Sequence, residues 1–114
     1  MPIPSQTPDR YRWKERPGHL ELVVPVPDTV RKEDVLVHMT NRVLMVGFKT
    51  PEGKGSWLVG GDLFGAIERE ESFWVLSKGS DFVDELTEGK TCIEVRLEKK
   101  EPFRRIWANV FKDQ

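Results

Sequence analysis

The chain has 114 residues, enough for one domain that buries roughly two thirds of its unfolded surface. Its 18 basic and 19 acidic residues nearly balance, which argues against strong attraction to nucleic acid or to an anionic membrane. Its single cysteine, Cys92, excludes an intramolecular disulfide, the first residues lack a signal-peptide pattern, and no apolar run could span a bilayer. We therefore expect a soluble protein from a reducing compartment, namely the cytoplasm.

The ends of the chain differ from its middle. Residues 1–9 are polar and rich in proline, which is typical of an extended tail. We expect the folded domain to span residues 10–111, and residues 112–114 to form a short C-terminal tail.

Alternating apolar residues predict several strands, each with one buried face. The alternation begins at Leu20–Val26, continues at Val35–Met39 and Leu44–Phe48, and is clearest at Ile93–Glu98. Turn signals rich in Gly, Pro and Asn separate the runs; they lie at residues 17–18, 40–41, 51–55, 60–62 and 88–90. Short strands at such intervals predict an all-β fold, a compact antiparallel β-sandwich or a barrel.

Four segments depart from this simple pattern. Pro25 and Pro27 end a good strand, which indicates an edge or a bulge because proline cannot donate to the ladder. Gly60-Gly61-Asp62 also indicates a bulge or a sharp bend. Residues 29–34 could form one helical turn, and residues 81–88 one or two turns that end at Gly89.

The sequence offers no recognisable catalytic, metal or cofactor site, so we expect a non-enzymatic protein without a small-molecule ligand. His19 and His38 fall within predicted strands, with no nucleophile motif nearby. His38 is expected to be an exposed strand residue. The mixed-charge run 68–71 is expected to be a solvated connection, where carboxylates keep ordinary chemistry.

Four tryptophans are spread along the chain, at positions 13, 57, 74 and 107. Large aromatic side chains usually stabilise a core. Trp74, within the strand-like segment 72–76, is therefore expected to be a core anchor. Trp107 lies beyond the last predicted strand, and we expect it to be available to a partner.

Several segments, in order, resemble the CS domain family and within it the NudC-like group. Weak matches are an aromatic opening at 11–13, a strand ending at Val24-Pro25, the strand 44–49, the last strand 95–99 and a trailing Trp107. The most specific match is Gly61-Asp62-Leu63-Phe64, followed at the family's spacing by Glu71-Ser72-Phe73-Trp74. The resemblance covers residues 11–111. It departs from the family at 77–88, where a tight turn is replaced by an insertion.

The resemblance implies a seven-stranded sandwich without an active site that binds other proteins. It further implies a co-chaperone or chaperone whose partners include heat-shock protein 90, components of dynein-dependent nuclear movement, or unfolded clients. Fold alone does not determine such partners. The insertion adds Phe82, Val83 and Leu86, which are expected either to fold back onto the sandwich or to form an additional contact surface.

Four residues are candidates for the protein-binding surface: Arg12, Lys14, Arg96 and Trp107. Arginine beside an aromatic side chain is frequent in interfaces. Two alternatives remain open. One is a holdase similar to small heat-shock proteins, although the chain lacks an Ile-x-Ile tail. The other is nucleic-acid binding through the basic, aromatic segment Lys99–Trp107.

Overall fold

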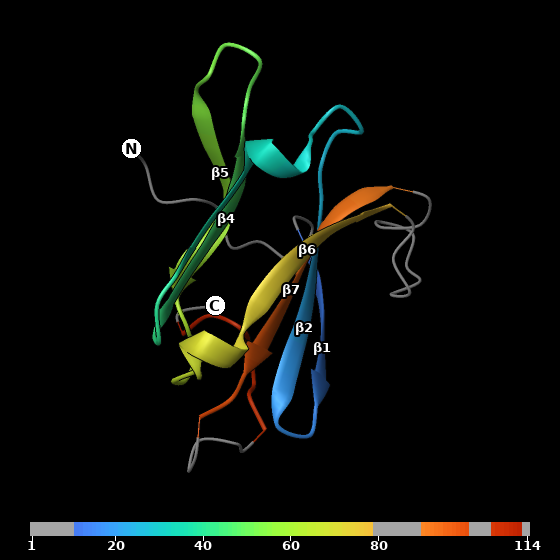
Figure 1. Ribbon diagram of the computed structural model, residues 1–114. Coiled ribbons are helices and arrows are strands. Elements are labelled where there is room, and N and C mark those ends of the chain that lie inside the picture. The colour runs from blue at the N-terminus through green and yellow to red at the C-terminus, as the bar shows by residue number, and fades with distance from the viewer. Residues whose placement is uncertain (1–10, 79–89, 101–105, 113–114) are drawn as a thin grey trace.

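The protein is a β-sandwich made of two antiparallel sheets. The computed structural model describes residues 11–78, 90–100 and 106–112. Within these ranges, seven strands form a four-stranded sheet in the order β1-β2-β7-β6 and a three-stranded sheet in the order β3-β4-β5 (Figure 1). The strands are β1 (Arg12–Arg16), β2 (His19–Pro25), β3 (Val35–Met39), β4 (Val43–Lys49), β5 (Gly55–Asp62), β6 (Phe73–Lys78) and β7 (Thr91–Glu98). The predicted fold class is confirmed.

Strands β2 and β7 form the centre of the four-stranded sheet. Their inward residues follow the predicted period of two and are fully buried or nearly so; they are Leu20, Leu22 and Val24 on β2 and Ile93, Val95 and Leu97 on β7. Burying each such aliphatic side chain contributes about 1.5–3 kcal/mol. The outward residues of the same two strands form the face that is considered below.

The smaller sheet contains one irregularity. Its register shifts between Val46 and Gly47, so that Leu58 of β5 is the extra residue opposite β4. Gly47 is required there, because a Cβ atom would collide with the backbone carbonyl of Ser56. The bulge predicted at residues 60–62 is therefore misplaced: these residues pair regularly with β4, although Gly61 has a φ of 148°.

The segment after β7 closes one end of the core. Leu63 forms an isolated bridge with Phe111, and the Phe64 amide donates to the Val110 carbonyl at 2.9 Å. Phe111 and Val110 are fully buried, and Trp107 is only 2% exposed. The expectation that Trp107 is accessible is wrong, because this segment folds back onto the sandwich.

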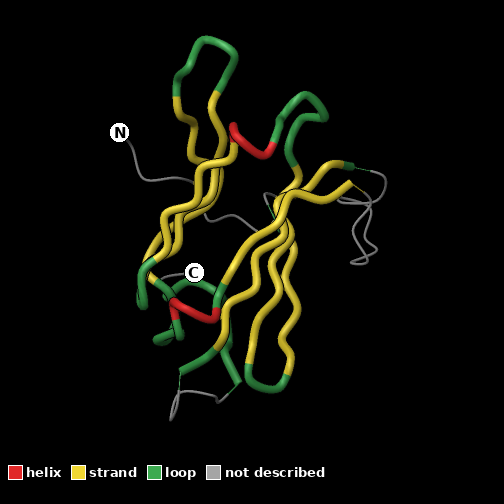
Figure 2. The backbone as a smooth tube through the Cα atoms, viewed as in Figure 1, coloured by secondary structure: helices red, strands yellow, loops and turns green. Residues whose placement is uncertain are grey.

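Two three-residue 3-10 helices, η2 (Lys32–Asp34) and η3 (Arg69–Glu71), connect strands (Figure 2). The first confirms the predicted helical turn, whereas the predicted turns at 81–88 and the insertion 77–88 lie largely outside the described residues. In the described part of the chain, no helix has the length or hydrophobicity to cross a membrane.

The predictions for Pro25 and Trp74 are confirmed only in part. Pro25 is the last residue of β2 and pairs with Cys92, but β2 is an interior strand and its register there is regular. The described pairing with β1 stops at Val23, so the proline lies beyond the part of β2 that β1 is seen to pair. Trp74 packs against the core but is only partly buried.

Candidate functional site

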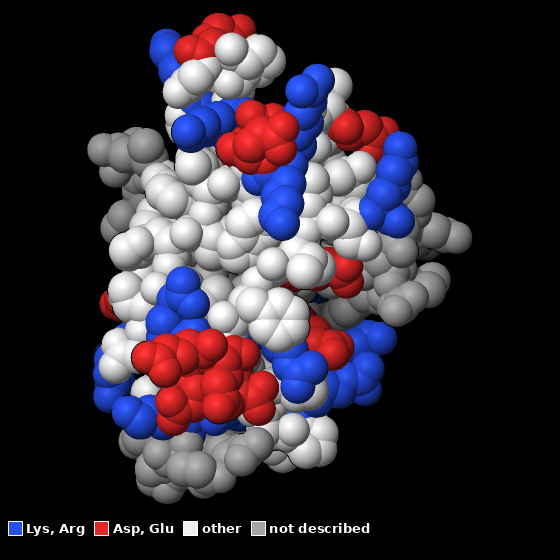
Figure 3. All heavy atoms as spheres, in the orientation of Figure 1, with Lys and Arg blue, Asp and Glu red and all other residues white. Residues whose placement is uncertain are grey.

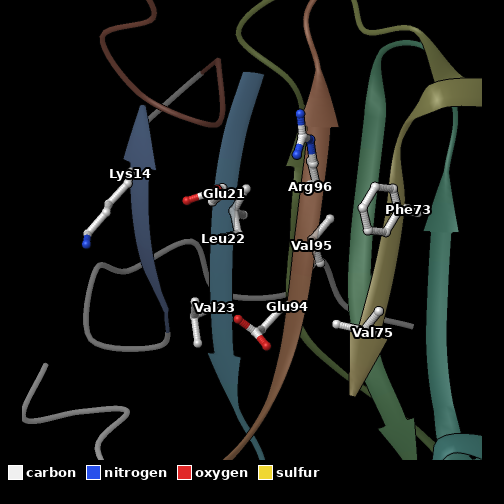
Figure 4. Close-up of a pocket in the computed structure, with 9 residues that line it drawn as sticks. All are labelled: Lys14, Glu21, Leu22, Val23, Phe73, Val75, Glu94, Val95 and Arg96. Carbon is white, nitrogen blue, oxygen red and sulfur yellow. The ribbon is translucent and has the colours of Figure 1, made fainter. Parts of the chain in front are cut away.

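The outer face of the four-stranded sheet collects side chains from all four strands in rows. The strand register places Lys14, Glu21, Arg96 and Phe73 side by side across the sheet. The adjacent row consists of Arg12, Val23, Glu94 and Val75. Because side chains two residues apart share a face of a strand, both rows point away from the core. Figure 4 shows most of these side chains on the four neighbouring strands.

The two rows surround a shallow hollow of about 260 Å³. Leu22 and Val95 contribute to its floor, and the outward side chains of both rows, except Arg12, line its walls. Phe73 and Val75, on β6, are 51% and 44% exposed. Exposed apolar side chains next to charged ones are typical of surfaces that bind other proteins.

Three side-chain contacts on this face are long. Arg16 Nε lies 3.5 Å from Glu21 Oε2, and Arg96 Nε lies 3.5 Å from Glu98 Oε2. His19 Nε2 lies 3.4 Å from Glu21 Oε1. The Arg16–Glu21 pair is largely exposed, and ion pairs of this kind contribute about 0–1 kcal/mol to stability, so its charges can be exchanged for contacts with a partner at little cost to the fold.

The molecule carries no dominant field of one sign on the face shown in Figure 3. Basic and acidic side chains form neighbouring clusters of both signs, the largest of them acidic, around a largely uncharged band. This distribution matches the balanced composition and favours short-range contacts over long-range attraction of a polyanion.

Three of the four predicted binding residues meet on this face, and the fourth does not. Arg12, Lys14 and Arg96 all point outward from β1 and β7. Trp107 lies in the core instead. Sequence reasoning missed Phe73, because apolar residues at four successive positions of β6 (73–76) hide which two face outward. The outward positions can be read only from the pairing of Phe73 with Arg96 and of Val75 with Glu94.

Trp107 belongs to a buried polar contact that fastens the C-terminal segment to β1. Glu15 Oε2 accepts a hydrogen bond from the Trp107 backbone amide at 2.6 Å and forms an ion pair with Lys99 Nζ at 2.7 Å. The Lys99 side chain is 1% exposed, and its Nζ lies 6.0 Å from the Trp107 ring centre. Gly65 gives the indole its space, since a Cβ atom there would come within 3.2 Å of it.

This contact weakens the nucleic-acid alternative. Lys99 and Trp107 mark the two ends of the proposed binding segment, yet both are buried and engaged with Glu15. The intervening residues 101–105, which include the two arginines of the segment, lie outside the described residues.

The described residues contain no cluster of three or more His, Cys, Asp and Glu that could hold a metal ion. His38 is exposed on β3, as expected. The run 68–71 contains η3, where the exposed Arg69 donates through Nε to the Met39 carbonyl at 2.9 Å. Burial raises the pKa of the Cys92 thiol, Glu94 raises it further, and Lys90 opposes them, so Cys92 is a poor nucleophile at neutral pH.

Comparison with known proteins agrees with this geometry. The solution structure of the CS domain of human KIAA1068 protein is similar over 93% of this chain and 75% of that chain, with a TM-score of 0.71 and 25% identity. A nuclear movement protein from E. cuniculi GB-M1 has the same fold, with a TM-score of 0.60 and 16% identity over 90% of this chain and 98% of that one. Residues 9–99 match the CS domain family, and the chain therefore belongs to that family.

Proposed function

We propose that this protein is a co-chaperone-like module that binds other proteins through the outer face of its four-stranded sheet. The observation that carries the proposal is the row Lys14-Glu21-Arg96-Phe73, which places two basic groups and an exposed aromatic ring beside an open hollow. Arginine and aromatic residues supply much of the binding energy of protein interfaces. Membership of the CS family supports the same reading.

Two classes of partner follow from this proposal. One is heat-shock protein 90 or a component of the dynein pathway, which would be bound as a folded surface. The other is an unfolded client, which would be held through its apolar residues. The cytoplasm is the compartment in which either activity is proposed.

The first test measures binding of purified heat-shock protein 90 by isothermal titration calorimetry. Arg96→Glu and Lys14→Glu should each weaken binding about tenfold or more, because they reverse a charge at the centre of the face. Lys49→Glu is the matched control, since Lys49 is exposed at the end of β4 in the other sheet. Equal affinity in all four proteins would rule out this surface, and no binding by any would rule out this partner.

The second test measures suppression of the thermal aggregation of a client such as citrate synthase. Phe73→Ser should reduce the protection, whereas Lys49→Glu should not. Protection that is unchanged in Phe73→Ser would show that an unfolded client does not use this face. Large assemblies in light scattering would instead favour the holdase alternative.

A further inference from the structure

The two edges of the four-stranded sheet are built differently. Strand β1 carries Arg12, Lys14 and Arg16 at alternate positions, and charged residues of this kind prevent edge strands from pairing with other chains. Strand β6 instead reads Phe-Trp-Val-Leu-Ser before its only charge, Lys78. It contains no proline and its register with β7 has no bulge, so one edge is protected and the other is not.

The hydrogen-bond pattern shows which groups of β6 face the open edge. The Thr91 carbonyl accepts a hydrogen bond from the backbone amide of Val26, just after β2, and the Glu98 amide donates to the side-chain Oγ of Ser72, just before β6. Alternate residues of an antiparallel strand bond to opposite neighbours, so Glu94 and Arg96 bond toward β6.

Their partners Val75 and Phe73 use their backbone groups on β7. The N–H and C=O groups of Trp74 and Leu76 consequently point away from the sheet. Among the described residues, no backbone hydrogen bond joins either of them to another segment.

Both side-chain faces of this edge are apolar. Phe73 and Val75 are about half exposed on the outer face. Trp74 and Leu76 lie on the inner face, where they pack against the core but stay only partly buried. A strand added beside β6 would cover apolar surface on both sides and satisfy the backbone groups of Trp74 and Leu76.

We propose that the strand added at this edge is β6 of a second copy of this chain, in an antiparallel pair about a twofold axis at Val75. With Val75 opposite Val75 of the second copy, Trp74 lies opposite Leu76 of the second copy, and Leu76 lies opposite its Trp74. These are the residues whose backbone groups face the edge, so hydrogen bonding and register agree. Aromatic and aliphatic residues directly opposite each other stabilise antiparallel pairs.

The charges at the two ends of β6 favour this occupant and this orientation. Glu71 is exposed just before the strand, and Lys78 is exposed at its end. Antiparallel pairing brings Lys78 opposite Ser72 of the second copy and within one residue of its Glu71, which the long lysine side chain can reach, and the twofold axis repeats this contact. A parallel pair would place like charges together. The strand is thus complementary to itself in shape, in hydrogen bonding and in charge, as an isologous interface requires.

Sedimentation equilibrium of the full chain over a range of concentrations tests the proposal. The protein should dimerise reversibly, and Val75→Lys should raise the dissociation constant at least about tenfold, because it places two ammonium groups at the axis. Ile106→Lys is the matched control, since Ile106 is 81% exposed and precedes Trp107, which binds Glu15 of β1 at the other edge of the sheet. A monomer at all concentrations up to about 1 mM, or a dimer that Val75→Lys leaves intact, would overturn the proposal.

A charge exchange identifies the partner strand. Glu71→Lys and Lys78→Glu should each weaken self-association roughly tenfold, because each places like charges together twice in the dimer. Mixing the two variants should restore dimers, since one copy then has Lys at both positions and the other has Glu at both. A mixture that remains monomeric while the unmodified chain dimerises would reject this register. Neither experiment depends on the binding of heat-shock protein 90 or of a client, so the outcome is independent of the proposed function.

Discussion

Replacement of Glu15 by Ala should be among the most destabilising changes on the edge strand β1. The carboxylate holds two groups at once, the buried Lys99 ammonium at 2.7 Å and the Trp107 backbone amide at 2.6 Å. Removing one partner of a buried ion pair typically costs about 3–5 kcal/mol, and a buried amide that loses its acceptor costs about 1–3 kcal/mol. Because the Glu15 side chain is 21% exposed, water can replace part of the contact, and we expect a loss of about 3 kcal/mol.

The assay is urea denaturation followed by tryptophan fluorescence, which reports on unfolding through the four tryptophans, Trp107 among them. Glu21→Ala is the matched control, since Glu21 makes long contacts with the exposed Arg16 at 3.5 Å and with the partly buried His19 at 3.4 Å, and the change should alter stability by less than about 1 kcal/mol. The double variant Glu15→Ala with Lys99→Met should be more stable than the sum of the two single changes predicts, because no buried charge then remains. Equal losses of stability in Glu15→Ala and Glu21→Ala would refute a stabilising role for the contact of Glu15 with Lys99 and Trp107.

Three further experiments test other parts of the structure. Gly47→Ala should cost about 1–3 kcal/mol in urea denaturation, since the new methyl group collides with the Ser56 carbonyl; a cost no larger than that of Gly53→Ala, whose Cβ meets open space at a φ of +83°, would contradict this. Cys92 should react with iodoacetamide far more slowly in the folded chain than in urea, and equal rates would show that the thiol is not buried. Folding raises the pKa of the Cys92 thiol above its ordinary value of 9.0. The contribution of this thiol to stability is therefore complete below pH 9.0 and is lost as the pH rises through the folded-state pKa. Cys92→Ala should flatten the alkaline fall in the free energy of unfolding, measured by denaturation.

The sequence by itself was sufficient for the fold class and for much of the candidate surface. A period of two is a local property, since successive side chains of a strand point to opposite faces, and Ile93–Glu98 showed it without ambiguity. The same alternation places Arg12 and Lys14 on one face of β1, and Arg96 on one face of β7. The three side chains lie on one surface because β1 and β7 belong to the same sheet and these faces point to the same side.

Only the tertiary structure decided where the bulge, the C-terminal segment and the open edge lie. Trp107 looked exposed because it follows the last strand, yet Glu15, which holds it, is 92 residues away in sequence. In β6, four successive apolar residues leave no local signal for which side faces out, and only the register with β7 separates Phe73 and Val75 from Trp74 and Leu76. Contacts between distant segments depend on which strands become neighbours, and the pattern within a single strand carries no information about its neighbours.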